Sequence, residues 1–136
     1  MQKVEHIGIA VNKLSEALPL YEKLLATSCY KKELVESEGV ETAFFRVGET
    51  KIELLESSDP NGVIARYISQ RGEGLHHIAF EVADIRAEMA RLKEAGFRLL
   101  KDEPSLGADN KWVCFIHPKS AGGVLVELCQ EREPLP

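Results

Sequence analysis

The sequence predicts an α+β fold in which two paired β-α-β-β-β modules form one curved, half-open barrel. The first observation is an internal repeat, because the segment HIGIAVNKLSEALPLYEKLLA from His6 aligns without a gap on HIAFEVADIRAEMARLKEAGF from His77. The second is that each copy leads into further segments of strand-like composition, separated by turns that contain glycine. A half of about 65 residues is only marginally stable alone, so the two modules are expected to share one core.

The predicted organisation is a single domain over residues 1–136. Its repeat halves span about residues 1–60 and 74–132. Residues 61–73 between them read as a short helical linker, because Ile64 and Ile68 lie one helical turn apart and Gly72 follows where a helix would end.

In the first module, the six residues from His6 predict a strand that leads into a helix. Ser15 is the expected N-cap of that helix, and Pro19 fits it only in or near the first turn, because proline lacks a backbone N–H. Three further strands are predicted at residues 28–35, 41–48 and 50–56.

The second module repeats this order. Asp84 is the expected N-cap of its helix, and Gly96 is the residue expected to end it. Three further strands are predicted at residues 97–104, 111–117 and 123–130.

Composition restricts the classes of function. A net charge of −5 argues against nucleic-acid binding, since phosphate recognition needs a basic surface. No long apolar run or signal-peptide pattern is present, so no membrane association is expected. The three cysteines are odd in number and form no C-x-x-C motif, which favours reduced, space-filling thiols in the cytoplasm.

Alternation along the predicted strands places four polar residues on one face. His6 and His77 each open a strand, and the next residue on the same face, Gly8 or Ala79, is small. Glu53 and Glu127 stand between apolar residues in the last strand of each half, a costly placement for a carboxylate without a partner. The repeat therefore pairs His6 with Glu53 and His77 with Glu127, and its approximate twofold symmetry predicts that all four meet.

Two imidazoles and two carboxylates without a thiolate are suitable ligands for divalent Co, Mn, Zn, Ni or Fe. Taken alone, a strand histidine is more often a core or surface group than a ligand, and Glu53 alone would read as a solvated glutamate. Recurrence of the four positions in both halves is what favours a metal site. His76 is left out of the ligand set, because alternation points it away from His77.

With these motifs, the sequence resembles the vicinal-oxygen-chelate superfamily and its glyoxalase/bleomycin-resistance-like fold. Over nearly its whole length it is similar to the methylmalonyl-CoA epimerase family, through EHIGIAV, TKIELLE, GEGLHHIAFEV and FIHPKSAGGVLVELCQ. The resemblance implies that His6, His77 and Glu127 bind a divalent metal ion and that Glu53 fills the position of a fourth ligand. It also implies that Glu127 takes part in proton transfer.

The implied activity is interconversion of (R)- and (S)-methylmalonyl-CoA through an enolate, with the coenzyme A thioester as substrate; a homodimer is also expected. One departure from the family concerns a second acid-base glutamate that some members carry. The matching position here is Thr42, and Glu41 stands one residue early, so it is expected on the opposite face of the sheet. The second acid-base group is therefore not identified by the sequence.

Three other functions on this fold remain open from the sequence. Glyoxalase I uses a similar set of histidine and glutamate ligands. A ring-cleaving dioxygenase typically uses two histidines and one glutamate, and a fourth ligand at Glu53 argues against it. A non-enzymatic small-molecule binder of the same fold needs no such set of four residues.

Overall fold

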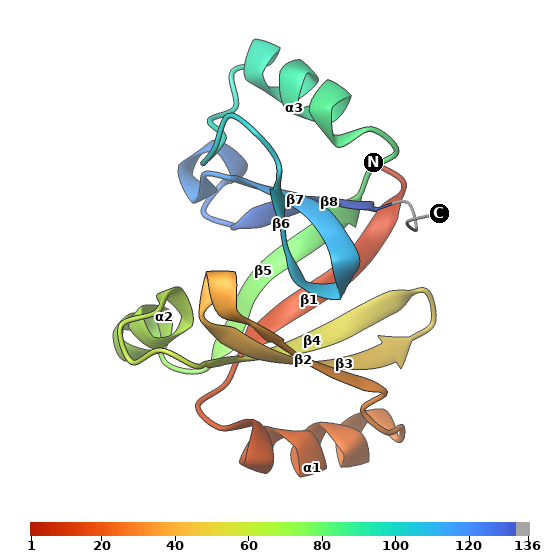
Figure 1. The fold of residues 1–136 in the computed structure, drawn as a ribbon, viewed down its shortest axis with the longest axis vertical. Helices are drawn as coiled ribbons and strands as arrows, with labels where there is room; N and C mark the ends of the chain where they lie inside the picture. The colour runs from red at the N-terminus through yellow and green to blue at the C-terminus, as the bar shows by residue number, and fades with distance from the viewer. Residues whose placement is uncertain (133–136) are drawn as a thin grey trace. The chain divides into compact units, whose positions relative to one another are not determined.

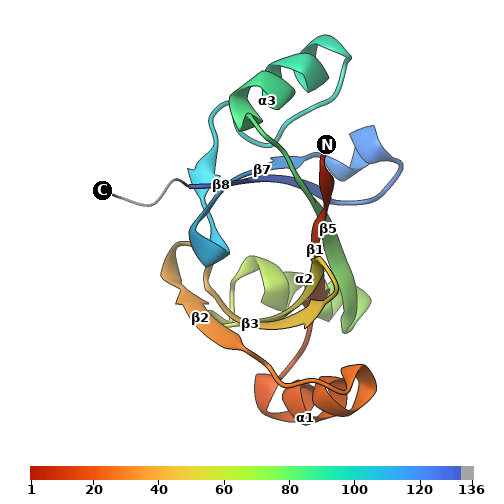
Figure 2. The same cartoon turned by 90° about the vertical axis from the view of Figure 1, so that its right-hand side faces the viewer.

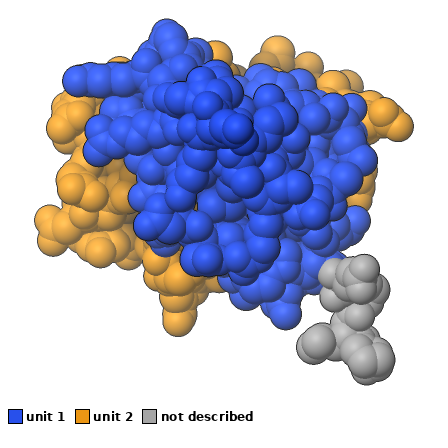
Figure 3. Space-filling view, turned by 90° about the horizontal axis from the view of Figure 1, so that it is seen from above, with its two compact units in different colours: residues 1–5, 77–136 blue, residues 6–76 orange. Residues whose placement is uncertain are grey.

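The structure is a computed structural model that describes residues 1–132 (Figure 1). It consists of two compact units, coloured separately in Figure 3. Unit 2 comprises residues 6–76, and unit 1 comprises residues 1–5 with residues 77 onward. Each unit contains strands covered by a helix and is described by itself.

Unit 2 contains four strands and two helices. Their bounds are β1 (Lys3–Ala10, of which residues 6–10 belong to this unit), α1 (Leu14–Leu25), β2 (Lys31–Val35), β3 (Val40–Val47), β4 (Thr50–Ser57) and α2 (Val63–Arg71), with a 3₁₀ turn η1 at Glu36–Glu38. Strands β2, β3 and β4 are antiparallel neighbours, and β1 runs parallel to β4. The predicted strand-helix-strand-strand-strand order is confirmed in this unit.

Helix α1 covers one face of these strands (Figure 2). Its buried residues Leu14 and Ala17 pack against Ala43, Phe45 and Leu54, which alternation places on the same side of β3 and β4. The opposite face is the one that carries His6, and we call it the histidine face of unit 2.

Unit 1 repeats this arrangement. Its elements are β5 (Gly74–Glu81, with residues 77–81 in this unit), α3 (Ile85–Glu94), β6 (Ser105–Leu106), β7 (Lys111–Ile116) and β8 (Val126–Glu131), with 3₁₀ turns η2 at Ala108–Asn110 and η3 at Pro118–Ala121. Strand β8 runs parallel to β5 and antiparallel to β7, and β7 pairs with β6. Helix α3 packs on Cys114, Ile116 and Leu128, and the other side is the histidine face of unit 1.

Equivalent backbone hydrogen bonds precede helix α1 in unit 2 and helix α3 in unit 1. The backbone N–H of Val11 donates to the Leu55 carbonyl at 2.9 Å, and that of Val82 donates to the Cys129 carbonyl at 2.9 Å. Each pair joins the end of the first strand to the last strand of its own unit. The chain therefore enters α1 and α3 by the same route.

A side chain from the last strand then holds the first turn of each helix. The Leu14 N–H donates to Glu56 Oε1 at 2.6 Å, and the Ile85 N–H donates to Gln130 Oε1 at 2.8 Å. Both acceptors lie three residues after the candidate ligand glutamate of their strand. They satisfy N–H groups that no helical carbonyl can reach.

The local helix signals are borne out except at α1. Asp84 is the N-cap of α3 and accepts a hydrogen bond from the Ala87 N–H, as predicted. Gly96 follows the end of α3 with a φ of 95°, and Gly72 ends α2 with a φ of 77°, values that favour glycine. The prediction that Ser15 caps α1 is wrong: the N-cap is Lys13, which makes no side-chain cap, and Glu56 supplies the acceptor.

Pro19 lies inside α1, just beyond the first turn. The helix continues to Leu25. Tertiary packing of the buried side of α1 on β3 and β4 compensates for the missing proline N–H.

The strand predicted at residues 97–104 is wrong. Only Leu99 forms an isolated bridge there, to Ile116, and the short strand β6 comes later, at Ser105–Leu106. Leu100 still donates a backbone hydrogen bond to Phe115. Asp102 and Pro104 then end this pairing, because an exposed acid has low strand propensity and proline has no N–H for the ladder.

Among the described residues, no helix is long and apolar enough to cross a membrane. Cys29, Cys114 and Cys129 are free thiols. Cys114 and Cys129 are buried, as expected of cysteines that fill space.

Candidate active site

In unit 2, His6 and Glu53 form a buried pair on the histidine face. His6 Nε2 lies 3.7 Å from Glu53 Oε1, and the two residues are 6% and 4% exposed. The parallel pairing of β1 with β4 sets Gly8 opposite Glu53, two residues beyond the histidine. Because Gly8 has no side chain, the imidazole and the carboxylate approach each other across the strands without obstruction.

In unit 1, His77 and Glu127 form the matching pair. His77 Nε2 lies 3.2 Å from Glu127 Oε1, and the residues are 7% and 5% exposed. The pairing of β5 with β8 sets the fully buried Ala79 opposite Glu127, so a small residue again stands beside the carboxylate. The edge of the His77 ring meets the Phe115 ring at a centroid distance of 5.8 Å, which fixes the plane of the imidazole.

The structure thus forms both predicted pairs, His6 with Glu53 and His77 with Glu127, each inside its own unit. Buried nitrogen and carboxylate oxygen atoms at this separation are the donors that a divalent cation of borderline softness prefers. The chemistry of the residues present therefore fits such a metal ion.

His76 takes no part in this arrangement. Its ring packs edge-on against Tyr67 of α2 at a centroid distance of 4.9 Å. Its neighbour His77 instead contacts Glu127 and Phe115. Of the two adjacent histidines, only the second therefore lies on the histidine face, as alternation predicts.

The register of β3 places Thr42 and Glu41 on opposite faces. The pairing with β4 is continuous from Val40 to Val47, so no bulge reverses the alternation. Thr42 is 1% exposed and lies on the histidine face of unit 2, whereas Glu41 pairs with Glu56 on the other side. Glu41 is therefore not turned toward the His6–Glu53 pair, in agreement with the sequence-based expectation.

Two buried polar residues of unit 1 were not predicted from the sequence. Lys111 and Glu5 are only 5% and 2% exposed, and Cys129, on the same face as Glu127, is fully buried. Burial chiefly raises the pKa of the Cys129 thiol above its ordinary value, and the carboxylates of Glu127 and Glu5 add to the effect. Alternation in KWVCFIH could have revealed Lys111, because it shares a face with the apolar Val113.

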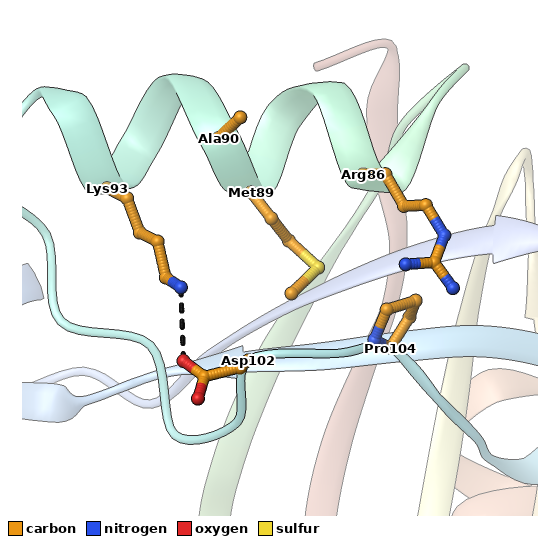
Figure 4. A pocket seen from close by; sticks show the side chains of 6 residues that line it. All are labelled: Arg86, Met89, Ala90, Lys93, Asp102 and Pro104. Carbon is orange, nitrogen blue, oxygen red and sulfur yellow. Dashed lines mark hydrogen bonds and ion pairs between the residues drawn. The ribbon is translucent and has the colours of Figure 1, made fainter.

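A pocket beside α3 lies apart from these pairs (Figure 4). Met89 belongs to the core that α3 forms with Leu128, on the side of β8 opposite Glu127. At its rim, Lys93 Nζ lies 3.0 Å from a carboxylate oxygen of Asp102. The lining residues are Arg86, Met89, Ala90, Lys93, Asp102 and Pro104.

Comparison with known proteins extends these observations. Residues 5–115 match the model of the Glyoxalase/Bleomycin resistance protein/Dioxygenase superfamily. An ethylmalonyl-CoA/methylmalonyl-CoA epimerase from Cereibacter sphaeroides is 40% identical, over 94% of this chain and 97% of the relative.

Two solved structures are similar over almost the whole chain. A hypothetical protein from Bacillus halodurans is 43% identical with a TM-score of 0.94, covering 98% of this chain and 97% of that one. A variant of methylmalonyl-CoA epimerase from Streptomyces coelicolor, in complex with 2-nitronate-propionyl-CoA, is 31% identical with a TM-score of 0.92, covering 98% and 99%. The predicted glyoxalase-like α+β fold is thereby confirmed.

Proposed function

The chain belongs to the methylmalonyl-CoA epimerase family of the glyoxalase/bleomycin-resistance superfamily, and from this premise we propose that it interconverts (R)- and (S)-methylmalonyl-CoA. The reaction is a 1,1-proton transfer through an enolate. Similarity to epimerases over 94% or more of the chain supports this activity. The observation in the structure that carries it is the pair of buried histidine–glutamate contacts, His6 with Glu53 and His77 with Glu127.

We propose that His6, Glu53, His77 and Glu127 hold one divalent metal ion, with Co, Mn, Zn or Ni as candidates. Burial of all four side chains supports this role, because a buried carboxylate is costly without a positive partner. When bound, such an ion supplies Lewis-acid stabilisation of negative charge that develops on the thioester oxygen. A glutamate at position 53, where some relatives carry glutamine, adds one negative charge to the ligand set.

The protein side of the reaction consists of binding and proton transfer. Epimerisation needs an acid-base group on each side of the reacting carbon. Glu127 is the proposed group on one side: one of its carboxylate oxygens accepts the proton or returns it. Glu127 is 5% exposed and pairs across β7 and β8 with Phe115, whose ring contacts His77.

The activity is tested by proton NMR of methylmalonyl-CoA in D₂O with metal-stripped protein, before and after addition of Co(II). We expect the α-proton signal to disappear only with metal. If the α-proton stays under both conditions, the epimerase proposal is wrong, and methylglyoxal with glutathione is the next substrate to assay. The expected homodimer and cytoplasmic location stay predictions, which sedimentation of the protein and fractionation of cells would check.

A further inference from the structure

We infer that Glu33 of β2 is the second acid-base group of this site. The inference rests on the proposed epimerase function and answers a question that the sequence left open. Position 42, where some relatives carry an acid-base glutamate, holds threonine here. A hydroxyl group is a poor base near neutral pH, so a carboxylate from elsewhere is needed.

The Thr42 side chain is already committed to a backbone contact. Its Oγ1 donates to the main-chain carbonyl of Glu33 at 3.2 Å, and the residue is 1% exposed. The hydroxyl proton therefore faces β2 and a peptide oxygen. In this geometry the Thr42 side chain links β3 to β2 by a hydrogen bond and is unsuited to proton transfer.

Glu33 lies directly across from Thr42 in the antiparallel pairing of β2 with β3. Residues paired in this way share a face of the sheet, and Thr42 in turn pairs with Leu55, two residues after Glu53. Glu33 therefore lies on the histidine face of unit 2, one strand beyond the position that the family's glutamate would occupy.

The other strand carboxylates of unit 2 do not compete for this role. Glu41 and Glu56 lie on the opposite face, and Glu56 Oε1 accepts a hydrogen bond from the Leu14 N–H. Among the described strand residues of unit 2, Glu33 and Glu53 are the carboxylates on the histidine face. Since Glu53 is the proposed ligand, Glu33 is the one that remains for proton transfer.

The spacing of Glu33 and Glu53 leaves room for a substrate between their side chains. Neighbouring strands lie about 4.8 Å apart and successive residues about 3.4 Å apart, so the backbones of Glu33 and Glu53 are separated by about 12 Å. Both side chains extend from the same face. The gap between their ends suits a small acyl group better than direct contact.

Lys31 holds the Glu33 side chain on this face. Its Nζ lies 3.5 Å from Glu33 Oε1 and 5.8 Å from the centroid of the Phe44 ring, which pairs with Glu53. The Lys31 ammonium group thereby contacts both the Glu33 carboxylate and the Phe44 ring of β3. Glu33 is 31% exposed at its side chain, which leaves it accessible to a substrate.

The proton balance of the step is simple. Glu33 takes the α-proton as the C–H bond breaks, and the electron pair of that bond passes into the enolate of the thioester. Glu127, in its acid form, delivers a proton to the opposite side of the carbon. The reverse reaction uses the same two groups with their roles exchanged.

The test follows exchange of the α-proton in D₂O separately from each pure stereoisomer of methylmalonyl-CoA, with Co(II) present. In Glu33→Gln we expect exchange from one stereoisomer and inversion to fall by about 100-fold or more. Exchange from the other stereoisomer should persist, because Glu127 still removes and returns its proton on one side. Glu41→Gln, on the opposite face of β3, is the matched control and should behave as the unaltered protein.

Glu33→Asp keeps the carboxylate and should keep the inversion measurably above that of Glu33→Gln. Equal loss for both stereoisomers, or inversion unaffected in Glu33→Gln, overturns the inference. If the unaltered protein exchanges neither stereoisomer, the proposed function fails instead, and this outcome is seen before any variant is compared.

Discussion

His77 Nε2 and Glu127 Oε1 lie 3.2 Å apart, with both residues less than 10% exposed. Buried polar groups need polar partners, and this contact supplies one to each of the two side chains. Their repeat-equivalents, His6 and Glu53, show the same relationship at 3.7 Å.

Replacing Glu127 by glutamine should reduce inversion of methylmalonyl-CoA, and α-proton exchange from one of its stereoisomers, by about 100-fold or more, because the amide cannot accept the substrate proton. Exchange rates in D₂O measure the effect. Glu131→Gln, four residues further along β8 and mostly exposed, is the control and should retain activity. Full activity in Glu127→Gln would contradict its role in proton transfer.

Metal binding should stabilise the folded protein. At Co(II) concentrations about 100 times the dissociation constant, the free energy of unfolding should rise by about 2.7 kcal/mol. His77→Ala should lose most of this gain, whereas His76→Ala should keep it, since the His76 ring packs on Tyr67 instead. Thermal unfolding with and without Co(II) makes the comparison, and an equal gain in both variants would argue against the ligand set.

The hydrogen bond from the Ile85 N–H to Gln130 Oε1 should contribute measurably to the free energy of unfolding. Gln130→Ala removes the acceptor for the Ile85 N–H and should lower the free energy of unfolding by about 1 kcal/mol. Gln130→Glu should be tolerated, because Glu56 performs the same task for Leu14 in unit 2. Urea unfolding of the unaltered protein and the two variants provides the measurement. An equal loss of stability in Gln130→Glu and Gln130→Ala would show that the side-chain acceptor at position 130 does not stabilise the helix.

Stability should fall at alkaline pH through Cys114. Burial raises the pKa of this thiol above its ordinary value of 9.0, so the folded state holds the proton more tightly than the unfolded state. The resulting stabilisation is complete below pH 9 and is lost as the pH rises toward the folded-state pKa. In that range Cys114 contributes a decrease of up to about 1.4 kcal/mol per pH unit in the free energy of unfolding.

The variant Cys114→Ala isolates this contribution. It leaves a small cavity, so it should be less stable at every pH, but its stability should decline less steeply above pH 9. Urea unfolding at a series of pH values compares the two slopes. Parallel slopes would mean that Cys114 does not carry the alkaline dependence.

Features that depend on a few neighbouring residues could be predicted from the sequence. Alternation with a period of two assigned His6 and His77 to one face of their strands and His76 to the other. The cap at Asp84 and the glycine at position 96 were equally readable, because each depends on a few neighbouring residues. The internal repeat then matched a glutamate to each histidine.

Features that depend on contacts between separate segments of the chain could not be predicted in this way. The first turn of α1 is held by Glu56, 42 residues away, so the local signal at Ser15 was misleading. Strand β6 of unit 1 formed at Ser105–Leu106 because β7 pairs there. The position of Glu33 opposite Thr42 likewise follows from the register of β2 on β3, which no pattern within either segment contains.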